Sequence, residues 1–256
     1  MLVAAAVCPC PPLLVPEVAT GAAPELDAAR TACADAVGLL AAARPDRLYV
    51  VGPAPGGAHG VYPAGTAGSF AGFGVDLSVR LGEASVGDGA DRPADGRPSG
   101  ADEGLPVGGR PLPVSLSVAA WLLGRAGWAD APIEGLGVDE AATPDVCAGV
   151  GRGLADSAAR VALLVMGDGS ACRTVKAPGY LDERAAGFDA EAARALGTAD
   201  ATALLALEPE LAYELKVAGR APWQVLAGAA EGAGLDGRLL FEDAPYGVGY
   251  FVAAWS

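Results

Sequence analysis

Short apolar runs that favour β-strands alternate with longer amphipathic segments along this chain of 256 residues. Expected strands lie at 2–7, 47–52, 133–138, 161–167, 238–242 and 247–255, and expected helices at 23–43, 114–125, 145–158, 181–196, 209–218 and 222–233. Such alternation is typical of a layered α/β domain, because helical crossovers join parallel strands. We therefore predict one α/β domain over residues 1–256, with a central, mostly parallel sheet flanked by helices.

One segment departs from this pattern. Residues 82–111 are rich in Gly, Asp and Pro and contain few apolar side chains. Such a composition favours a long, flexible surface loop. Because the α/β pattern continues on both sides, we interpret the segment as an insertion within one domain and not as a linker between two.

The charge balance excludes several classes of protein. With 17 basic and 31 acidic residues the net charge is −14, so the surface repels phosphate backbones and anionic membranes. We therefore expect no nucleic-acid or membrane partner. The single histidine, His59, excludes sites that need two or more imidazoles from one chain, such as three-histidine zinc sites.

The N-terminus and the cysteines indicate the compartment. The first basic residue is Arg30, so the apolar start lacks the basic region of a secretory signal. The longest later apolar run, 161–166, is too short to span a bilayer. Five cysteines are an odd number, which argues against a disulfide framework. We expect a cytoplasmic protein with reduced thiols.

Residues that packing does not require gather at four expected strand ends, in the segments 8–17, 50–60, 166–185 and 241–253. Ligands of open α/β sheets bind beyond the carboxyl ends of the strands, so we expect these segments to meet. We expect one of the thiols Cys8 and Cys10 to face a pocket and the other to face the core. The predicted pocket is lined by Cys10, Ala54, His59, Asp168, Ser170, Cys172 and Glu242, with Arg173 and Lys176 near its mouth.

The same segments resemble one known family. PPLLVPE at 11–17, GDGS at 167–170, APGYLDERA at 177–185 and APYGVGYFVA at 244–253 are similar to the class III extradiol ring-cleavage dioxygenases. This is the LigB-type superfamily, and the chain looks closest to its bacterial branch that includes Memo-like proteins. The resemblance runs from residue 1 to 256 and implies the LigB-like α/β fold.

The resemblance also implies an iron site. In the family two histidines and a carboxylate bind Fe(II), which chelates a catechol and binds O2. Here Cys10 stands at the position of the first histidine and Ala54 at that of the second, whereas Glu242 matches the carboxylate. His59 lies five residues after Ala54 and reaches the site only if the loop shifts.

The acid/base residue that the resemblance implies is replaced as well. The family carries a Ser-His pair in the third segment, where this chain reads Ser170-Ala171, followed by Cys172. Loss of a general acid/base typically costs about 100- to 10,000-fold in rate. We therefore predict that ring cleavage by the family mechanism does not occur.

Two functional hypotheses follow. In the first, the chain is a homologue without the family chemistry that binds a small molecule or a protein partner and needs no cofactor. In the second, it is a repurposed, oxidoreductase-like enzyme that depends on a thiol or a metal. Cys10 and Cys172 with Glu242, or Cys10 and His59 with Glu242, would then hold zinc or another divalent metal.

The thiol version of the second hypothesis makes Cys10 a nucleophile activated by Arg173 or Lys176. The same two cations offer a site for an anionic small molecule on an otherwise acidic protein. The structural alternatives are that Cys10 fills the space of a lost imidazole and that the cations pair with surface carboxylates. A protein partner and a homo-oligomer both remain compatible with the sequence.

Overall fold

The computed structural model describes residues 1–83 and 109–256. Its strands are β1 (Leu2–Cys8), β2 (Arg47–Pro53), β3 (Gly60–Tyr62), β4 (Ala67–Ser69), β5 (Ser78–Arg80), β6 (Ile133–Val138), β7 (Val161–Met166), β8 (Gly237–Asp243) and β9 (Tyr250–Trp255). Its helices are α1 (Pro16–Ala19), α2 (Asp27–Ala42), α3 (Val114–Ala126), α4 (Pro144–Asp156), α5 (Ala185–Gly197), α6 (Ala201–Leu205), α7 (Pro209–Glu214) and α8 (Arg220–Ala229). The loop predicted at 82–111 lies, except for its two ends, outside the described residues.

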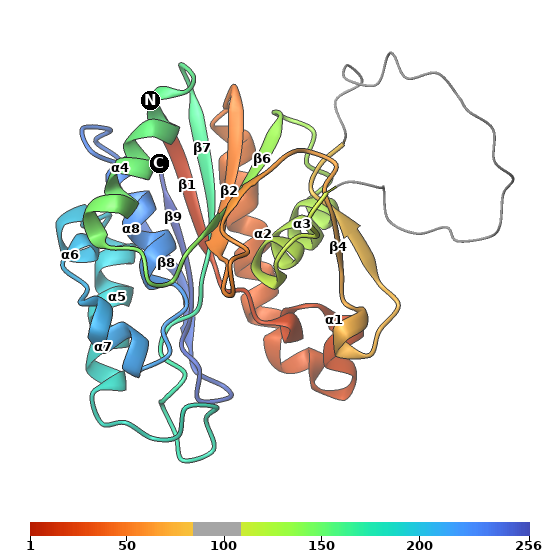
Figure 1. Ribbon diagram of the computed structural model, residues 1–256, viewed down its shortest axis with the longest axis vertical. Helices are drawn as coiled ribbons and strands as arrows, with labels where there is room; N and C mark the ends of the chain where they lie inside the picture. Colours follow the sequence, from red (N-terminus) through yellow and green to blue (C-terminus); the bar gives the residue numbers. More distant parts are fainter. Residues whose placement is uncertain (84–108) are drawn as a thin grey trace, which may run out of the picture.

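Seven strands form one sheet in the order β3-β6-β2-β7-β1-β9-β8 (Figure 1). The central strands β6, β2, β7 and β1 run parallel, whereas β3 and β9 are antiparallel to their neighbours. Every residue of β7 is buried, as expected for a parallel strand covered on both faces. The predicted α/β class with a parallel core is confirmed, and antiparallel strands on both sides of that core make the whole sheet mixed.

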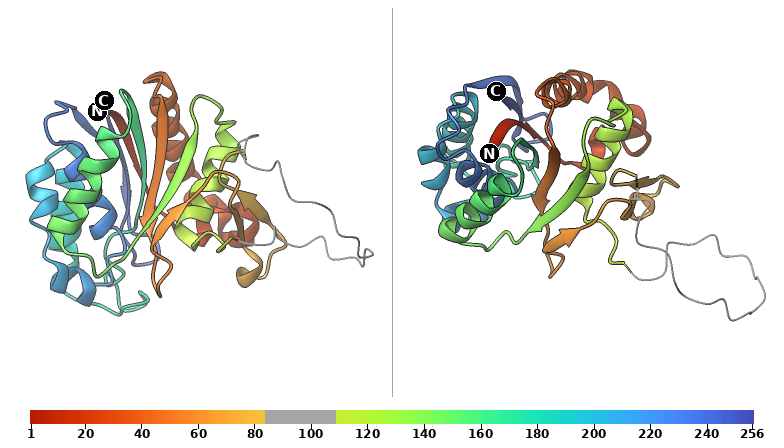
Figure 2. Two further views of the ribbon diagram at one scale, coloured as in Figure 1. Left: turned by 45° about the horizontal axis from the view of Figure 1, so that its top comes forward. Right: turned by 90° about the horizontal axis from the view of Figure 1, so that it is seen from above.

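Helices cover both faces of the sheet. Helices α1 to α3 lie on one face and α4 to α8 on the other (Figures 1 and 2). Side chains of β1 alternate between the two cores, with Ala5 and Val7 facing α4–α8 and Ala6 and Cys8 facing α2 and α3. We call these two faces the α4–α8 face and the α2–α3 face.

Helices α4 and α8 approach each other closely through glycines. A Cβ atom on Gly151 of α4 would collide with the backbone of α8 at Val225. A Cβ atom on Gly228 of α8 would collide with the backbone of α4 at Ala148. The two backbones therefore touch because neither contact residue carries a side chain.

Most expected strands and helices occur within a few residues of their predicted bounds. The last strand was predicted from 247 but begins at Tyr250, because Gly247 and Gly249 instead bond to the segment after β7. The helix predicted from 181 begins at Ala185. The short strands β3, β4 and β5 and the short helices α1 and α6 were not predicted. No helix in the described ranges is long and apolar enough to cross a membrane.

Candidate functional site

The adjacent strands β1 and β7 send the chain to opposite faces of the sheet. After β1 the chain continues to α2 on the α2–α3 face, and after β7 it continues to α5 on the α4–α8 face. In open α/β sheets such a switch forms a crevice at the carboxyl ends of the strands. Cys10 and Asp168 each lie two residues beyond these ends. The topology therefore places the candidate site here.

Backbone groups hold Asp168 in this crevice. The Cys10 N–H donates to Asp168 Oδ1 at 2.8 Å, and the Asp168 carbonyl accepts the Gly219 N–H at 2.8 Å. Burial raises the pKa of Asp168 to about 7, although the Cys10 N–H acts in the other direction. At neutral pH this carboxyl group is therefore present in both forms and can either donate or accept a hydrogen bond.

The Cys10 thiol is buried in the same core cluster as Cys8. Burial, followed by the negative charges of Asp168 and Glu140, raises the pKa of Cys10 well above its ordinary value. A thiol in such surroundings stays protonated at neutral pH and is a poor nucleophile. The expectation that Cys8 and Cys10 face different ways was wrong, because residues two positions apart in an extended chain share a face.

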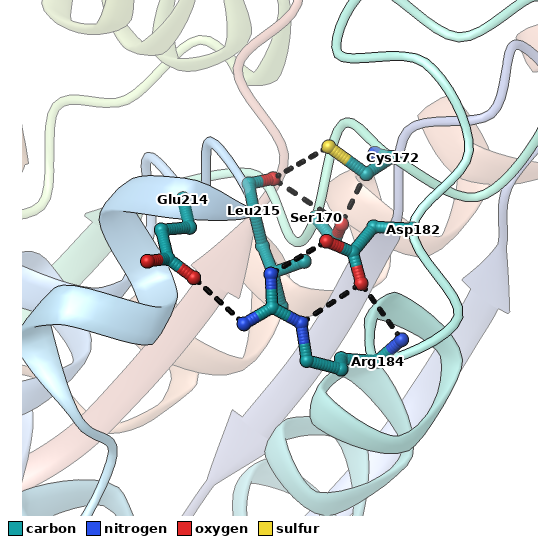
Figure 3. Close-up of polar contacts among 6 residues, drawn as sticks. All are labelled: Ser170, Cys172, Asp182, Arg184, Glu214 and Leu215. Atoms are coloured by element: carbon teal, nitrogen blue, oxygen red, sulfur yellow. Dashed lines mark hydrogen bonds and ion pairs between the residues drawn. The ribbon is translucent and has the colours of Figure 1, made fainter.

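Ser170 and Cys172 lie on the other side of the sheet, where both side chains contact the Leu215 carbonyl (Figure 3). The Ser170 hydroxyl donates to this oxygen at 3.2 Å and accepts the Cys172 N–H at 3.1 Å. The Cys172 sulfur lies 3.5 Å from the same oxygen. Because Cys10 belongs to the α2–α3 face and Cys172 to the α4–α8 face, the two predicted thiols do not form one site.

An ion pair between a half-buried arginine and a buried carboxylate, which was not predicted, fixes the segment after β7. The side chain of Asp189, on α5, is fully buried and accepts the Ser170 N–H at 2.8 Å and Arg173 Nη1 at 2.9 Å. A Cβ atom on Gly169 or Gly249 would crowd this carboxylate. Arg173 is therefore engaged by a carboxylate, but this carboxylate is buried and not at the surface, where the alternative for this cation had placed it.

The remaining predicted residues lie apart from one another. Ala54 is buried at the end of β2, with its N–H donating to the Val138 carbonyl at 2.9 Å. His59 is exposed, with Nδ1 3.9 Å from Asp139 Oδ2. Lys176 is exposed in the loop before α5. Glu242 is exposed on β8, where it pairs with Phe251 on the α4–α8 face.

The positions of these residues test the two sets of metal ligands that the sequence suggested. In the parts of the chain that the structure describes, no three His, Cys, Asp or Glu side chains are grouped so as to hold a metal ion. Cys10, His59 and Glu242 are thus not brought together, and neither are Cys10, Cys172 and Glu242.

A cavity of about 450 Å³ opens at the same edge of the sheet, and Asp168 is not among its lining residues. It is lined by Glu140, Ala212, Tyr213, Glu214, Lys216, Val217, Ala218 and Arg220. Glu140 follows β6, and Arg220 is the first residue of α8 and adjoins Gly219, which bonds to Asp168. We call this space the carboxyl-edge cavity.

The charged residues of the carboxyl-edge cavity were not predicted. Burial raises the pKa of Glu140, and the charge of Asp139 adds to this effect. Glu214 Oε2 accepts Arg184 Nη1 at 2.7 Å, and Arg184 also binds Asp182, so this arginine links the segment before α5 to α7 (Figure 3). The helix was predicted to begin at 222 but begins at Arg220. The signal that was missed is therefore a cation in the first turn of a helix, where the helix dipole disfavours it.

A larger cavity, of about 710 Å³, lies at the opposite edge of the sheet. Its lining includes Arg47 and Ile133, the first residues of β2 and β6, together with Trp128. Ligand sites of open α/β sheets form at the carboxyl ends of the strands, so we assign the candidate site to the carboxyl-edge cavity and its neighbour Asp168.

Comparison with known proteins identifies the fold. The structure is similar to the crystal structure of uncharacterized protein JW3007 from Escherichia coli K12, with a TM-score of 0.52 and 15% sequence identity over 99% of each chain. At this identity the likeness shows a shared fold and nothing finer. The chain matches no family model and no curated protein.

Proposed function

We propose that this chain is a LigB-like protein that binds a small molecule at the carboxyl edge of its sheet and does not cleave aromatic rings. The observation that carries the proposal is the carboxyl-edge cavity, whose lining residues Ala218 and Arg220 flank Gly219. The Gly219 N–H bonds to the Asp168 carbonyl in the crevice where β1 and β7 send the chain to opposite faces. The cavity volume of about 450 Å³ lies within the range of about 300–1,000 Å³ that is common for small-molecule sites.

The residues present do not fit the iron site that the resemblance implies. A ferrous site of this type needs two imidazoles and a carboxylate. The corresponding positions hold the Cys10 thiol, the Ala54 methyl group and Glu242, and Glu242 lies on the opposite face from Cys10. Ala171, at the position of the acid/base histidine, has no proton to transfer. These side chains support a binding protein and not the family chemistry.

The thiol-dependent alternative receives less support. The raised pKa of Cys10 disfavours the thiolate, and Arg173, one of its two suggested activators, is paired with Asp189 on the other face. Cys172 is buried against the Leu215 carbonyl. We therefore place binding, and not covalent catalysis, at this edge.

The proposal is tested by filling the cavity. Thermal unfolding is measured with a panel of small carboxylates, phosphates, amines and neutral aromatic compounds, for the wild type and for Ala218→Trp. A ligand at 100 times its Kd stabilises the folded state by about 2.7 kcal/mol, so it raises the Tm of the wild type. We expect Ala218→Trp to abolish that rise, and Val146→Trp, on the exposed side of α4, to retain it.

The iron prediction has its own measurement. Protein purified without oxygen and loaded with Fe(II) is analysed for bound metal and for catechol cleavage, together with Cys10→Ser and Glu242→Gln. We expect no ring-cleaved product from any of the three proteins. Stoichiometric iron with turnover that Glu242→Gln abolishes would overturn the proposal, as would a ligand that binds equally well to Ala218→Trp.

A further inference from the structure

Arg220 is a buried cation without a carboxylate partner among the described residues. Its side chain, 2% exposed, donates to the carbonyl oxygens of Glu140 and Ala142 and, at 3.0 Å, to Gln224 Oε1. All ion pairs of the described residues involve other cations. Buried charges are costly unless they are paired. The carboxylates of Glu140 and Asp139 attract Arg220 only from beyond ion-pair distance, so they offset its positive charge in part and leave the rest uncompensated.

The helix that carries Arg220 adds to this positive potential. Arg220 begins α8, a helix of ten residues, and the N-terminus of a helix carries about half a positive charge. An arginine in this turn is repelled by its own helix, and an anion placed there is attracted by both. The positive potential of Arg220 and of the α8 N-terminus therefore costs free energy when the site is empty and stabilises an anion that binds there.

Lys216 brings a second cation to the same cavity. Its backbone has a φ of 55°, a left-handed conformation that is uncommon for a residue with a side chain. The Lys216 N–H donates to the Tyr213 carbonyl at 3.1 Å. The neighbouring Glu214 is occupied by Arg184, and no carboxylate in the described ranges lies within ion-pair distance of the Lys216 ammonium group.

We propose that the carboxyl-edge cavity binds the oxyanion of a small molecule, a carboxylate or a phosphate monoester, between Lys216 and Arg220. This proposal rests on the proposed function and names its ligand class. Val217 and the Tyr213 ring, which also line the cavity, contact the apolar part of the ligand. Glu140 is the acidic group of the lining that has no cationic side chain within ion-pair distance among the described residues, so it opposes the anion.

The test measures binding of benzoate, phenyl phosphate and the neutral benzamide by calorimetry at low ionic strength. We expect both anions to bind the wild type and benzamide to bind at least tenfold more weakly, because a charge-assisted hydrogen bond contributes about a factor of ten or more. The stronger of the two anions identifies the oxyanion that the site prefers. Equal binding of benzamide and benzoate, or no binding of either anion, would overturn the proposal.

Charge variants locate the site. We expect Lys216→Gln to weaken benzoate binding about tenfold and Glu140→Gln to strengthen it several-fold. Lys176→Gln changes the other lysine of the chain, which is exposed outside the cavity, and should leave binding unchanged. Arg220→Gln is compared with Arg220→Lys, which keeps the charge, and the Tm of each variant shows whether it folds.

The outcomes separate this inference from the proposed function. A neutral ligand whose binding Ala218→Trp abolishes but Lys216→Gln does not change would leave the proposed function standing and refute the anion site. Weakening by Lys176→Gln and not by Lys216→Gln would place the anion at the segment before α5 and refute the site proposed here.

Discussion

The Asp168 carboxyl group couples the stability of the fold to pH. Its pKa is about 7 in the folded protein, whereas an aspartate in an unfolded chain has a pKa of about 3.9. Between these values the folded state holds a proton that the unfolded state has released. The resulting stabilisation is fully present below about pH 4 and is lost as the pH rises through 7. The shift sets an upper bound of about 4 kcal/mol, which partial exposure of Asp168 reduces.

We predict that Asp168→Asn removes this pH dependence. The amide imitates the neutral acid and can still accept the Cys10 N–H, so the variant should gain about 2 kcal/mol on the wild type between pH 5 and pH 8. Urea unfolding at the two pH values measures the difference, and Asp35→Asn, at an exposed position of α2, serves as the control. Parallel pH profiles for wild type and Asp168→Asn would contradict the prediction.

At the scale of single residues, the sequence predicted where a residue lies in the fold better than it predicted which groups its side chain contacts. The end of a buried strand can be recognised from its own residues, so the positions of Cys10 and Asp168 just beyond β1 and β7 were predicted. The partner of a charged side chain depends on how distant segments pack. The pairing of Arg173 with Asp189 and the hydrogen bonds from Arg220 to the carbonyl oxygens of Glu140 and Ala142 were therefore not predicted. Asp189 follows Phe188 on the buried face of α5, and a lone acid on an apolar helix face was the available signal.

At the scale of elements, the contact between α4 and α8 can be tested by comparing Gly151, which lies at the contact, with Gly153, which lies away from it. We predict that Gly151→Ala destabilises the fold by about 2 kcal/mol or more, because the new methyl group collides with the backbone of α8. Gly153→Ala, on the same helix, meets nothing within 4 Å and should stabilise it by about 0.5–1 kcal/mol through helix propensity. Urea unfolding of the two variants should therefore give shifts of opposite sign. Stabilisation by Gly151→Ala as well as by Gly153→Ala would show that the helices are not in backbone contact.

The helices and strands that were predicted are those whose own residues determine whether they form a helix or a strand. Strands β1, β2, β6 and β7 are apolar on both sides because helices cover both faces of the sheet. By contrast, β3 is three residues long with Val61 exposed, and it exists only because it pairs with β6. Helix α6 has a signal that was missed, since Asp200 caps it by accepting the Ala203 N–H at 3.0 Å.

At the scale of the whole molecule, the two ends of the chain lie side by side, because β1 and β9 are antiparallel neighbours with Ala5 opposite Trp255 (Figure 2). We predict that a circular permutant folds when a short Gly/Ser linker joins the ends and the chain is opened between Gly232 and Ala233. Gly232 is exposed in the turn after α8, and its position leaves the sheet intact.

The matched control opens the chain between Leu163 and Leu164, inside the buried strand β7, and should not fold. Far-UV circular dichroism and urea unfolding distinguish the two permutants. Failure of the turn-opened permutant with success of the strand-opened one would contradict the arrangement of the sheet.

The position of β1 has a consequence for how the protein is made. Its two neighbours in the sheet, β7 and β9, are residues 161–166 and 250–255, so both leave the ribosome long after it. Both hydrogen-bonding edges of β1 therefore stay unpaired, and its side chains on the α4–α8 face stay open to other chains, until residues 161–166 and 250–255 have been made. Folding in the cell should depend on chaperones that shield this N-terminal strand during translation.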